Sequence, residues 1–147
     1  METHSCKTYF AIGLEFDKRK NAALLKERRD CLPEEIGILN KDEVERAIVT
    51  RLSVTPVWRR HSFEIGLNET YCADVNEMIR VTLKDLFGKE ERLKKLQEEF
   101  SASMVLEIVP CIESGSADPK PVLSLGQDII AFLYESGAEV DIDYYVY

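Results

Sequence analysis

Histidine and cysteine are scarce in this 147-residue sequence, and the four cysteines are widely scattered. No CxxC pair occurs, and the two histidines, His4 and His61, lie far from each other, so the local spacing gives no support for a zinc site. We expect Cys72 and Cys111 to be small core residues, and Cys6 and Cys31 to be free thiols in a reducing compartment. The sequence therefore predicts neither a metal nor another cofactor.

The sequence also lacks long apolar runs and an excess of basic residues. No stretch approaches the roughly 18–20 apolar residues of a membrane span, and none resembles the apolar core of a signal peptide. The 27 acidic residues outnumber the 19 lysines and arginines, which gives a net charge of −8. Because nucleic acids and anionic membranes attract basic surfaces, we expect neither as a partner. A cytoplasmic location is the expectation that follows.

The motifs of several common enzyme classes are absent as well. GxSxG, GxxxxGK(S/T), GxGxxG and HExxH do not occur, so the sequence indicates no nucleophile, phosphate-binding loop or zinc-binding helix. No catalytic residue is predicted. With 45% hydrophobic and 31% charged residues, the chain has the composition of a globular protein, and its length fits one domain over residues 1–147.

Alternation of apolar and polar residues predicts four strands. They span residues 7–16, 57–67, 103–112 and 138–147. In the second strand, Phe63 and His61 share the apolar face. Trp58 and Arg60 lie on the opposite face. The third strand is apolar on both faces apart from Glu107, which is typical of a central strand.

Apolar residues at three- and four-residue intervals predict helices. These span residues 41–52, 74–86 and 124–136, and a further stripe over 89–100 either extends the second helix or forms a separate one. Asn40, Asp74 and Ser124 are each followed three residues later by Glu or Gln, which is the pattern of a capping box. Gly88 and Gly137 stand where helices are expected to end. Residues 17–40 are predicted to be a loosely packed excursion.

The order of these elements predicts an α+β fold. We expect a two-layer sandwich in which helices cover one face of a four- to five-stranded, mainly antiparallel sheet. The other face of the sheet is only half-polar in sequence. We therefore expect a partner or a second copy of the chain to cover it.

A row of carboxylates lies on one face of the last predicted strand. Glu139, Asp141 and Asp143 are two residues apart, which places successive side chains about 6.5–7 Å apart on that face. Such a row can bind a hard cation or take part in acid–base catalysis. Since no glycine-bearing loop or second set of ligands accompanies it, we favour a solvated strand whose charges deter edge-to-edge pairing.

Aromatic and basic side chains form two further candidate groups. Trp58, with Arg59 and Arg60, is suited to stacking on a ligand or anchoring a protein interface. Alternatively, Arg60 pairs with acids across the sheet and Trp58 covers one end of the core. The second group closes the sequence and comprises Tyr144, Tyr145 and Tyr147. These tyrosines suit a recognition surface, although tyrosine also favours strands.

Several blocks of the sequence together resemble a bacterial family known as domain of unknown function 4279. They are TYFAIGLEF, EVERAIVTRLSVTP, the strand beginning at Trp58, the helix through Met78 and Leu86, and LSLGQDIIAFLYESGAEVDIDYYVY. The closing block, with Asp141 and Asp143, carries most of the likeness. Two features depart from the family's pattern: residues 17–40 form a longer link, and the glycine-bearing basic loop before Trp58 is missing. The resemblance implies a small α+β protein with no established activity, cofactor or catalytic residue.

Three hypotheses about function follow from the sequence. The first is a non-enzymatic domain that acts through protein–protein binding, for instance an immunity-type protein, because a small acidic domain can cap the basic cleft of a toxin. Its candidate binding residues are Trp58, Arg59, Arg60, Asp141, Asp143, Tyr145 and Tyr147. The alternative is a small-molecule binder or enzyme with a pocket near Trp58, Arg60 and Asp141. The third is a homodimer formed through the half-polar sheet face.

Overall fold

The computed structural model describes residues 4–14, 40–71 and 74–147. The strands are β1 (Ser5–Leu14), β2 (Val57–Arg59), β3 (Ser62–Thr70), β4 (Ala102–Ile112), β5 (Glu139–Ile142) and β6 (Tyr145–Val146). The helices are α3 (Lys41–Leu52), α4 (Val75–Leu83), α5 (Glu90–Phe100) and α6 (Gln127–Ser136). Most of the predicted excursion, together with Cys31 and Cys72, lies outside the described residues.

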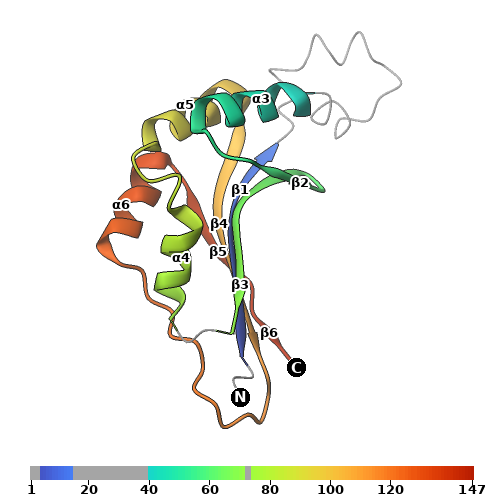
Figure 1. Cartoon of the computed structure of the whole chain (residues 1–147), viewed down its shortest axis with the longest axis vertical. Helices are drawn as coiled ribbons and strands as arrows, with labels where there is room; N and C mark the ends of the chain where they lie inside the picture. The colour runs from blue at the N-terminus through green and yellow to red at the C-terminus, as the bar shows by residue number, and fades with distance from the viewer. Residues whose placement is uncertain (1–3, 15–39, 72–73) are drawn as a thin grey trace.

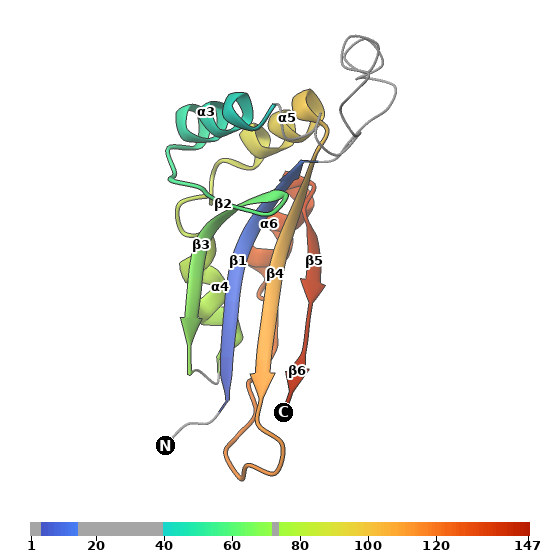
Figure 2. The same ribbon diagram turned by 90° about the vertical axis from the view of Figure 1, so that its right-hand side faces the viewer.

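The six strands form one sheet in the order β2-β3-β1-β4-β5, with β6 also paired to β4 (Figure 2). β1 is antiparallel to both β3 and β4, while β5 and β6 run parallel to β4. α4 and α6 lie along one face of the sheet, and α3 and α5 lie at one end of it (Figure 1). The predicted α+β fold class is confirmed.

The core lies between the sheet and the helices. Even-numbered residues of β1 and β4 point into it, as the alternation in sequence predicts, and Phe10, Ile12 and Leu106 are fully buried. Phe132 of α6 packs edge-on against Phe10, with 5.9 Å between the ring centroids. Burial of these apolar side chains fixes which face of the sheet the helices cover.

A bulge in β3 brings α4 unusually close to the sheet. The pairing of β1 with β3 shifts register between Thr8 and Phe10, where Gly66 has a φ of +68°. A Cβ atom at Gly66 would lie 2.2 Å from the carbonyl oxygen of Thr82. The hydroxyl groups of Thr8 and Thr82 form a buried hydrogen bond of 2.7 Å at the same place. Helix and sheet are therefore joined by polar contacts as well as by apolar burial.

The second predicted strand is in fact a hairpin. A turn at Arg60 and His61 separates β2 from β3, so Trp58 pairs with Phe63 and shares its face. The prediction that these two side chains lie on opposite faces was wrong. His61 is exposed in the turn rather than placed on the core side. Arg60 has a φ of 59°, which is uncommon for a residue other than glycine, and so the sequence contained no ordinary turn signal.

The predicted helix ends were right in part. The Asp74 side chain accepts a hydrogen bond from the Glu77 N–H, as a capping box requires, and Gly137 ends α6 with a φ of +74°. Asn40 makes no side-chain capping bond, and α6 begins after Gly126 rather than at Ser124. Residues 74–100 form two helices with a turn between them, not one continuous helix.

The prediction that Cys111 is a core residue was wrong, and Cys6 occupies the core instead. Cys6 is fully buried in the core, whereas Cys111 is half-buried on the opposite face of the sheet. The reason is the register of β1 and β4, in which Cys6 pairs with Pro110 on the core side and Cys111 pairs with Ser5. Composition does not reveal this register, because either thiol suits a core position.

We expect Gly66→Ala to destabilise the fold by at least about 3 kcal/mol, because the new Cβ adds a backbone clash to the cost of a left-handed conformation. Gly88→Ala is the matched control, since Gly88 has a φ of +86° but no atom within 4 Å of the added Cβ. The free energy of unfolding of that variant should fall by about 1–2 kcal/mol. Urea unfolding of both variants measures the difference. Equal losses would show that the close approach of α4 is unimportant.

Candidate functional site

The face of the sheet opposite the helices is the main candidate for a functional site. We call it the open face, because no helix in the described ranges covers it (Figures 1 and 2). Odd-numbered residues of β1, β4 and β5 point to this side. It is the half-polar face that the sequence predicted to be available for a partner.

Strand pairing places an acidic cluster on this face. Tyr9 pairs with Glu107, and Glu107 pairs in turn with Asp141, so the three side chains lie in one row across β1, β4 and β5. Asp143 follows on the same side of the chain, where its N–H donates to the Ile108 carbonyl at 2.9 Å. We call Glu107, Asp141 and Asp143 the acidic centre.

The carboxyl group of Glu107 is perturbed by its surroundings. Burial, the hydrogen bond with Asp141 and the negative charges of Asp141 and Asp143 raise its pKa to about 7 from an ordinary 4.5. Charging all three carboxylates is unfavourable because they are close together. Near neutral pH, Glu107 is therefore protonated about as often as it is ionised.

Two tyrosines flank the acidic centre. The pKa of Tyr9 is raised above 10, first by burial and next by the negative charge of Glu107. The pKa of Tyr145 is raised mainly because its hydroxyl hydrogen-bonds with Asp143. Lys7 adds a cation near the ring of Tyr9, with 5.6 Å from its Nζ atom to the ring centroid. Both phenols therefore stay protonated at neutral pH and are available as hydrogen-bond donors.

The β2–β3 hairpin supplies positive charge to the open face. It bends away from α4 and α6 toward that side of the sheet (Figures 1 and 2). Arg59 forms an ion pair with Glu64, with 3.6 Å between its Nε atom and the carboxylate. Arg60 is near enough to the C-terminal strands for its charge to oppose the rise in the pKa of Tyr145. The face therefore combines an acidic centre with arginines at one side.

The structure brings together only part of the predicted site. Arg60, Asp141, Asp143 and Tyr145 share the open face, as does Arg59.

Trp58 lies on the helix-covered face instead, with its ring 4.8 Å from that of Phe63 and Lys41 above it at 5.3 Å. A pocket containing both Trp58 and Asp141 is not formed, because β2 and β5 are opposite edges of the sheet. Tyr147 is exposed at the end of the chain, and its N–H donates to the Ile112 carbonyl.

Sequence reasoning missed two members of the site, Glu107 and Tyr9. A signal for Glu107 was present, because it is the one charged residue in the apolar run 103–112. A lone charge in a central strand needs either a partner or an open face. What the sequence could not supply was the register that places Asp141 beside it.

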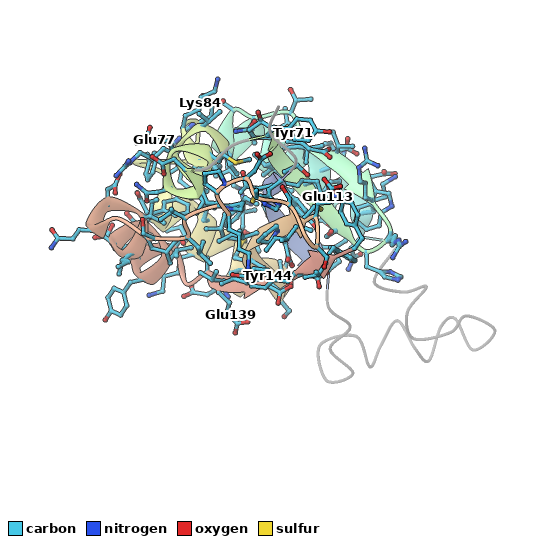
Figure 3. All side chains as sticks on the ribbon, turned by 90° about the horizontal axis from the view of Figure 1, so that it is seen from below. Tyr71, Glu77, Lys84, Glu113, Glu139 and Tyr144 are labelled. Carbon is cyan, nitrogen blue, oxygen red and sulfur yellow. The ribbon has the colours of Figure 1, made fainter. Side chains whose placement is uncertain are left out.

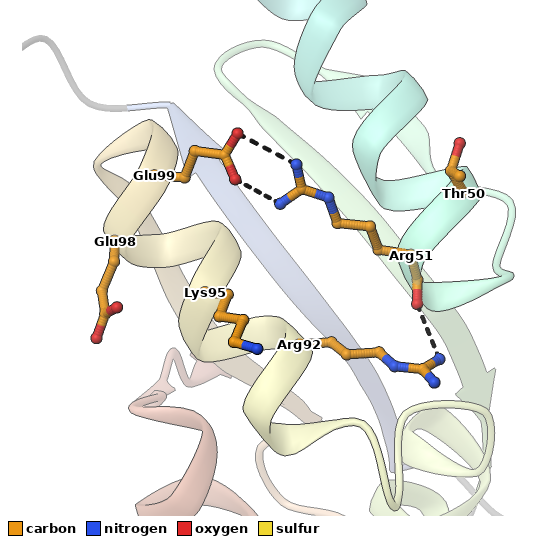
Figure 4. Close-up of a pocket in the computed structure, with 6 residues that line it drawn as sticks. All are labelled: Thr50, Arg51, Arg92, Lys95, Glu98 and Glu99. Carbon is orange, nitrogen blue, oxygen red and sulfur yellow. Dashed lines mark hydrogen bonds and ion pairs between the residues drawn. The ribbon is translucent and has the colours of Figure 1, made fainter.

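Away from the open face, a hollow with a volume of about 730 Å³ lies between α3 and α5 (Figure 4). Glu99 holds the Arg51 guanidinium through two hydrogen bonds of 2.6 and 3.1 Å, which lowers the pKa of Glu99. Arg92 donates to the Arg51 carbonyl at 3.1 Å. These groups bind one another and join the two helices, so we interpret the hollow as a structural contact rather than a ligand site.

Two properties of the described residues bear on function. Within residues 4–14, 40–71 and 74–147, no group of three or more His, Cys, Asp or Glu side chains is arranged to hold a metal ion. None of the helices in these ranges combines the length and the apolar character needed to cross a membrane.

Residues 41–147 match the family model described as Domain of unknown function (DUF4279), and the chain therefore belongs to this family. The resemblance inferred from sequence is confirmed. No curated protein and no solved structure matches the chain significantly. The match begins at Lys41, so β1 lies outside it although this strand occupies the middle of the sheet.

The pKa of Glu107 predicts a pH-dependent stability. Between about 4.5 and 7 the folded chain binds more protons at this residue than the unfolded chain, so stability falls as the pH rises through that range. Glu107→Gln mimics the protonated form. Because the group is open to solvent, we expect the variant to be more stable than wild type by about 1 kcal/mol at pH 8 and nearly equal to it at pH 5.

Urea unfolding at the two pH values measures this difference. Glu139→Gln serves as the control, because Glu139 is an exposed acid on the adjacent strand and its substitution removes the same charge. An equal gain at pH 5 and pH 8, or the same profile in the control, would contradict the proton sharing inferred for Glu107.

Proposed function

We propose that this chain is a non-enzymatic protein-binding domain that recognises a basic partner through its open face. The observation that carries the proposal is the acidic centre, which lies on a sheet face without a covering helix in the described residues. A cation from a partner placed there would relieve the carboxylate repulsion that, together with burial, raises the pKa of Glu107. Tyr9 and Tyr145 offer aromatic surface and hydroxyl donors beside it, as protein interfaces commonly do.

The net charge of −8 supports the same conclusion, because it attracts a basic partner over a longer range than the contacts themselves. An immunity-type protein that caps the basic cleft of a toxin is the concrete role that we propose. We place this activity in the cytoplasm, where Cys6 and Cys111, which do not form a disulfide with each other, stay reduced.

The proposal predicts that capture of the partner depends on the acidic centre. A variant with Glu107→Gln, Asp141→Asn and Asp143→Asn removes three charges from the open face, so it should lose the partner. Cross-linking in cell lysate followed by affinity capture compares it with wild type. The captured protein is then purified, and its affinity is measured at low and high salt, where wild-type binding should weaken as salt increases.

The matched control removes three exposed acids from the helices and comprises Asp42→Asn, Glu43→Gln and Glu91→Gln. It makes the same change in net charge far from the open face. It should retain the partner. If both triple variants lose the partner equally, net charge alone explains the loss. If both capture the partner as well as wild type does, the proposal is refuted.

A small-molecule binder or enzyme that uses the open face is the second candidate. The observation that favours it is the pKa of Glu107, because a group near 7 can both donate and accept a proton at neutral pH. Arg60 and Asp141 remain available to such a ligand. A metabolite present at 100 times its dissociation constant should stabilise the fold by about 2.7 kcal/mol, and Glu107→Gln should abolish that gain. No stabilisation across a metabolite screen would remove this candidate.

A further inference from the structure

β5 is an edge strand of the sheet formed by the described residues. It is the last strand in the order β2-β3-β1-β4-β5, and all four of its residues are exposed. The Asp143 N–H points to β4, where it meets the Ile108 carbonyl. Because main-chain groups alternate along a strand, those of Asp141 also face β4, and those of Val140 and Ile142 face outward. The edge therefore presents N–H and C=O groups with no strand beyond them in the described part of the chain.

The side chains along this edge form two chemically different rows. Glu139 and Asp141 lie on the open face, while Val140 and Ile142 lie on the face toward the helices. Val140 and Ile142 are 37% and 42% exposed, so an added strand would cover apolar surface there. Figure 3 shows Glu139 projecting outward from this edge into solvent. A strand placed beside β5 would therefore meet acids with one side of its chain and apolar groups with the other.

The charge of the edge decides between possible occupants. A second copy of the chain, paired through its own β5, would bring carboxylates close to carboxylates, which is unfavourable. A strand with lysine or arginine at every second position would instead pair each cation with an acid. The opposite edge, β2, has three residues and carries Arg59, so it offers a basic strand neither length nor complementary charge.

We propose, building on the protein-binding function above, that the partner docks by strand addition, with an extended segment of alternating basic and apolar residues pairing along the outer edge of β5. The main chain of Val140 and Ile142 supplies the hydrogen bonds. Glu139 and Asp141 select the cations of the segment, and the apolar residues between those cations cover the exposed side chains on the other face. The partner thus approaches from the edge and reaches the acidic centre from there.

The experiment uses the capped pentapeptide Lys-Val-Lys-Val-Lys and the ¹⁵N-labelled chain, followed by NMR. At saturating peptide, amide exchange should slow at Val140 and Ile142, whose N–H groups face outward. Asp141 and Asp143, which face β4, should change much less. The permuted peptide Lys-Lys-Lys-Val-Val has the same charge and composition. It should bind more weakly and should not protect these amides, because it lacks the alternation.

A backbone substitution tests the same contact from the side of the protein. Val140→Pro removes one outward N–H at a position where an edge strand tolerates proline. It should weaken binding of the alternating peptide by at least about tenfold. Val140→Ile keeps both the N–H and an apolar side chain, so it should lose far less affinity than Val140→Pro. A peptide that carries N-methyl groups on one edge repeats the test without altering the protein and should also bind more weakly.

The outcomes separate this inference from the proposed function. Peptide binding without protection at Val140 and Ile142, or unchanged binding by Val140→Pro, would overturn strand addition while leaving dependence on the acidic centre intact. Protection of the same amides in a self-associated chain, shown by sedimentation, would make a second copy the occupant and would also overturn it. Equal capture of the cellular partner by both triple variants would instead refute the proposed function itself.

Discussion

The pairing of β1 with both β3 and β4 is the constraint on which the rest of the structure depends. All ten residues of β1, Ser5–Leu14, pair with β4 on one side, and residues between Cys6 and Gly13 pair with β3 on the other, so this strand lies in the middle of the sheet. This position sets Tyr9 beside Glu107 on the open face and Thr8 against Thr82 on the covered face. Both the helix packing and the candidate site therefore follow from one register. The family match leaves this strand out, although the matched residues cannot form a continuous sheet without it.

The acidic centre imposes an electrostatic cost on this arrangement. Glu107 lies in an otherwise apolar strand, and Asp141 of β5 and Asp143, which follows β5, add two more carboxylates beside it. A proton held by Glu107 relieves the repulsion at neutral pH, but leucine or valine at that position would avoid it entirely. A cation from a ligand can replace the proton, so binding of the ligand would release the proton from Glu107. The cost in stability is thus consistent with a site whose charge balance is completed by something outside the chain.

The sequence predicted the elements well where one physical signal dominated. The alternation in β1, the apolar run of β4 and the stripe of α3 each led to the correct element, and α3 has the predicted bounds. The hairpin at Arg60 was missed because a left-handed arginine gives no turn signal in sequence. The sequence predicted only part of the candidate site, because strand pairing, like the turn, has no local signal. Local spacing placed Asp141 and Asp143 on one face, but only the pairing of distant strands shows that Glu107 joins them.

Glu139 and Asp141 of β5 have two effects on strand pairing: they deter some strands and favour others. Charges on an edge strand deter pairing with unwanted strands, and an acidic chain gains from this because every copy of it carries the same edge. The same charges favour a strand of opposite sign. An opposite-charge pair across strands contributes roughly 0.2–1 kcal/mol and a like-charge pair opposes pairing by a similar amount, so two positions discriminate between the two cases by about 1–4 kcal/mol. That difference corresponds to a factor of roughly five to several hundred in affinity. Discrimination of this size needs no cavity, because it comes from the charges of the edge alone.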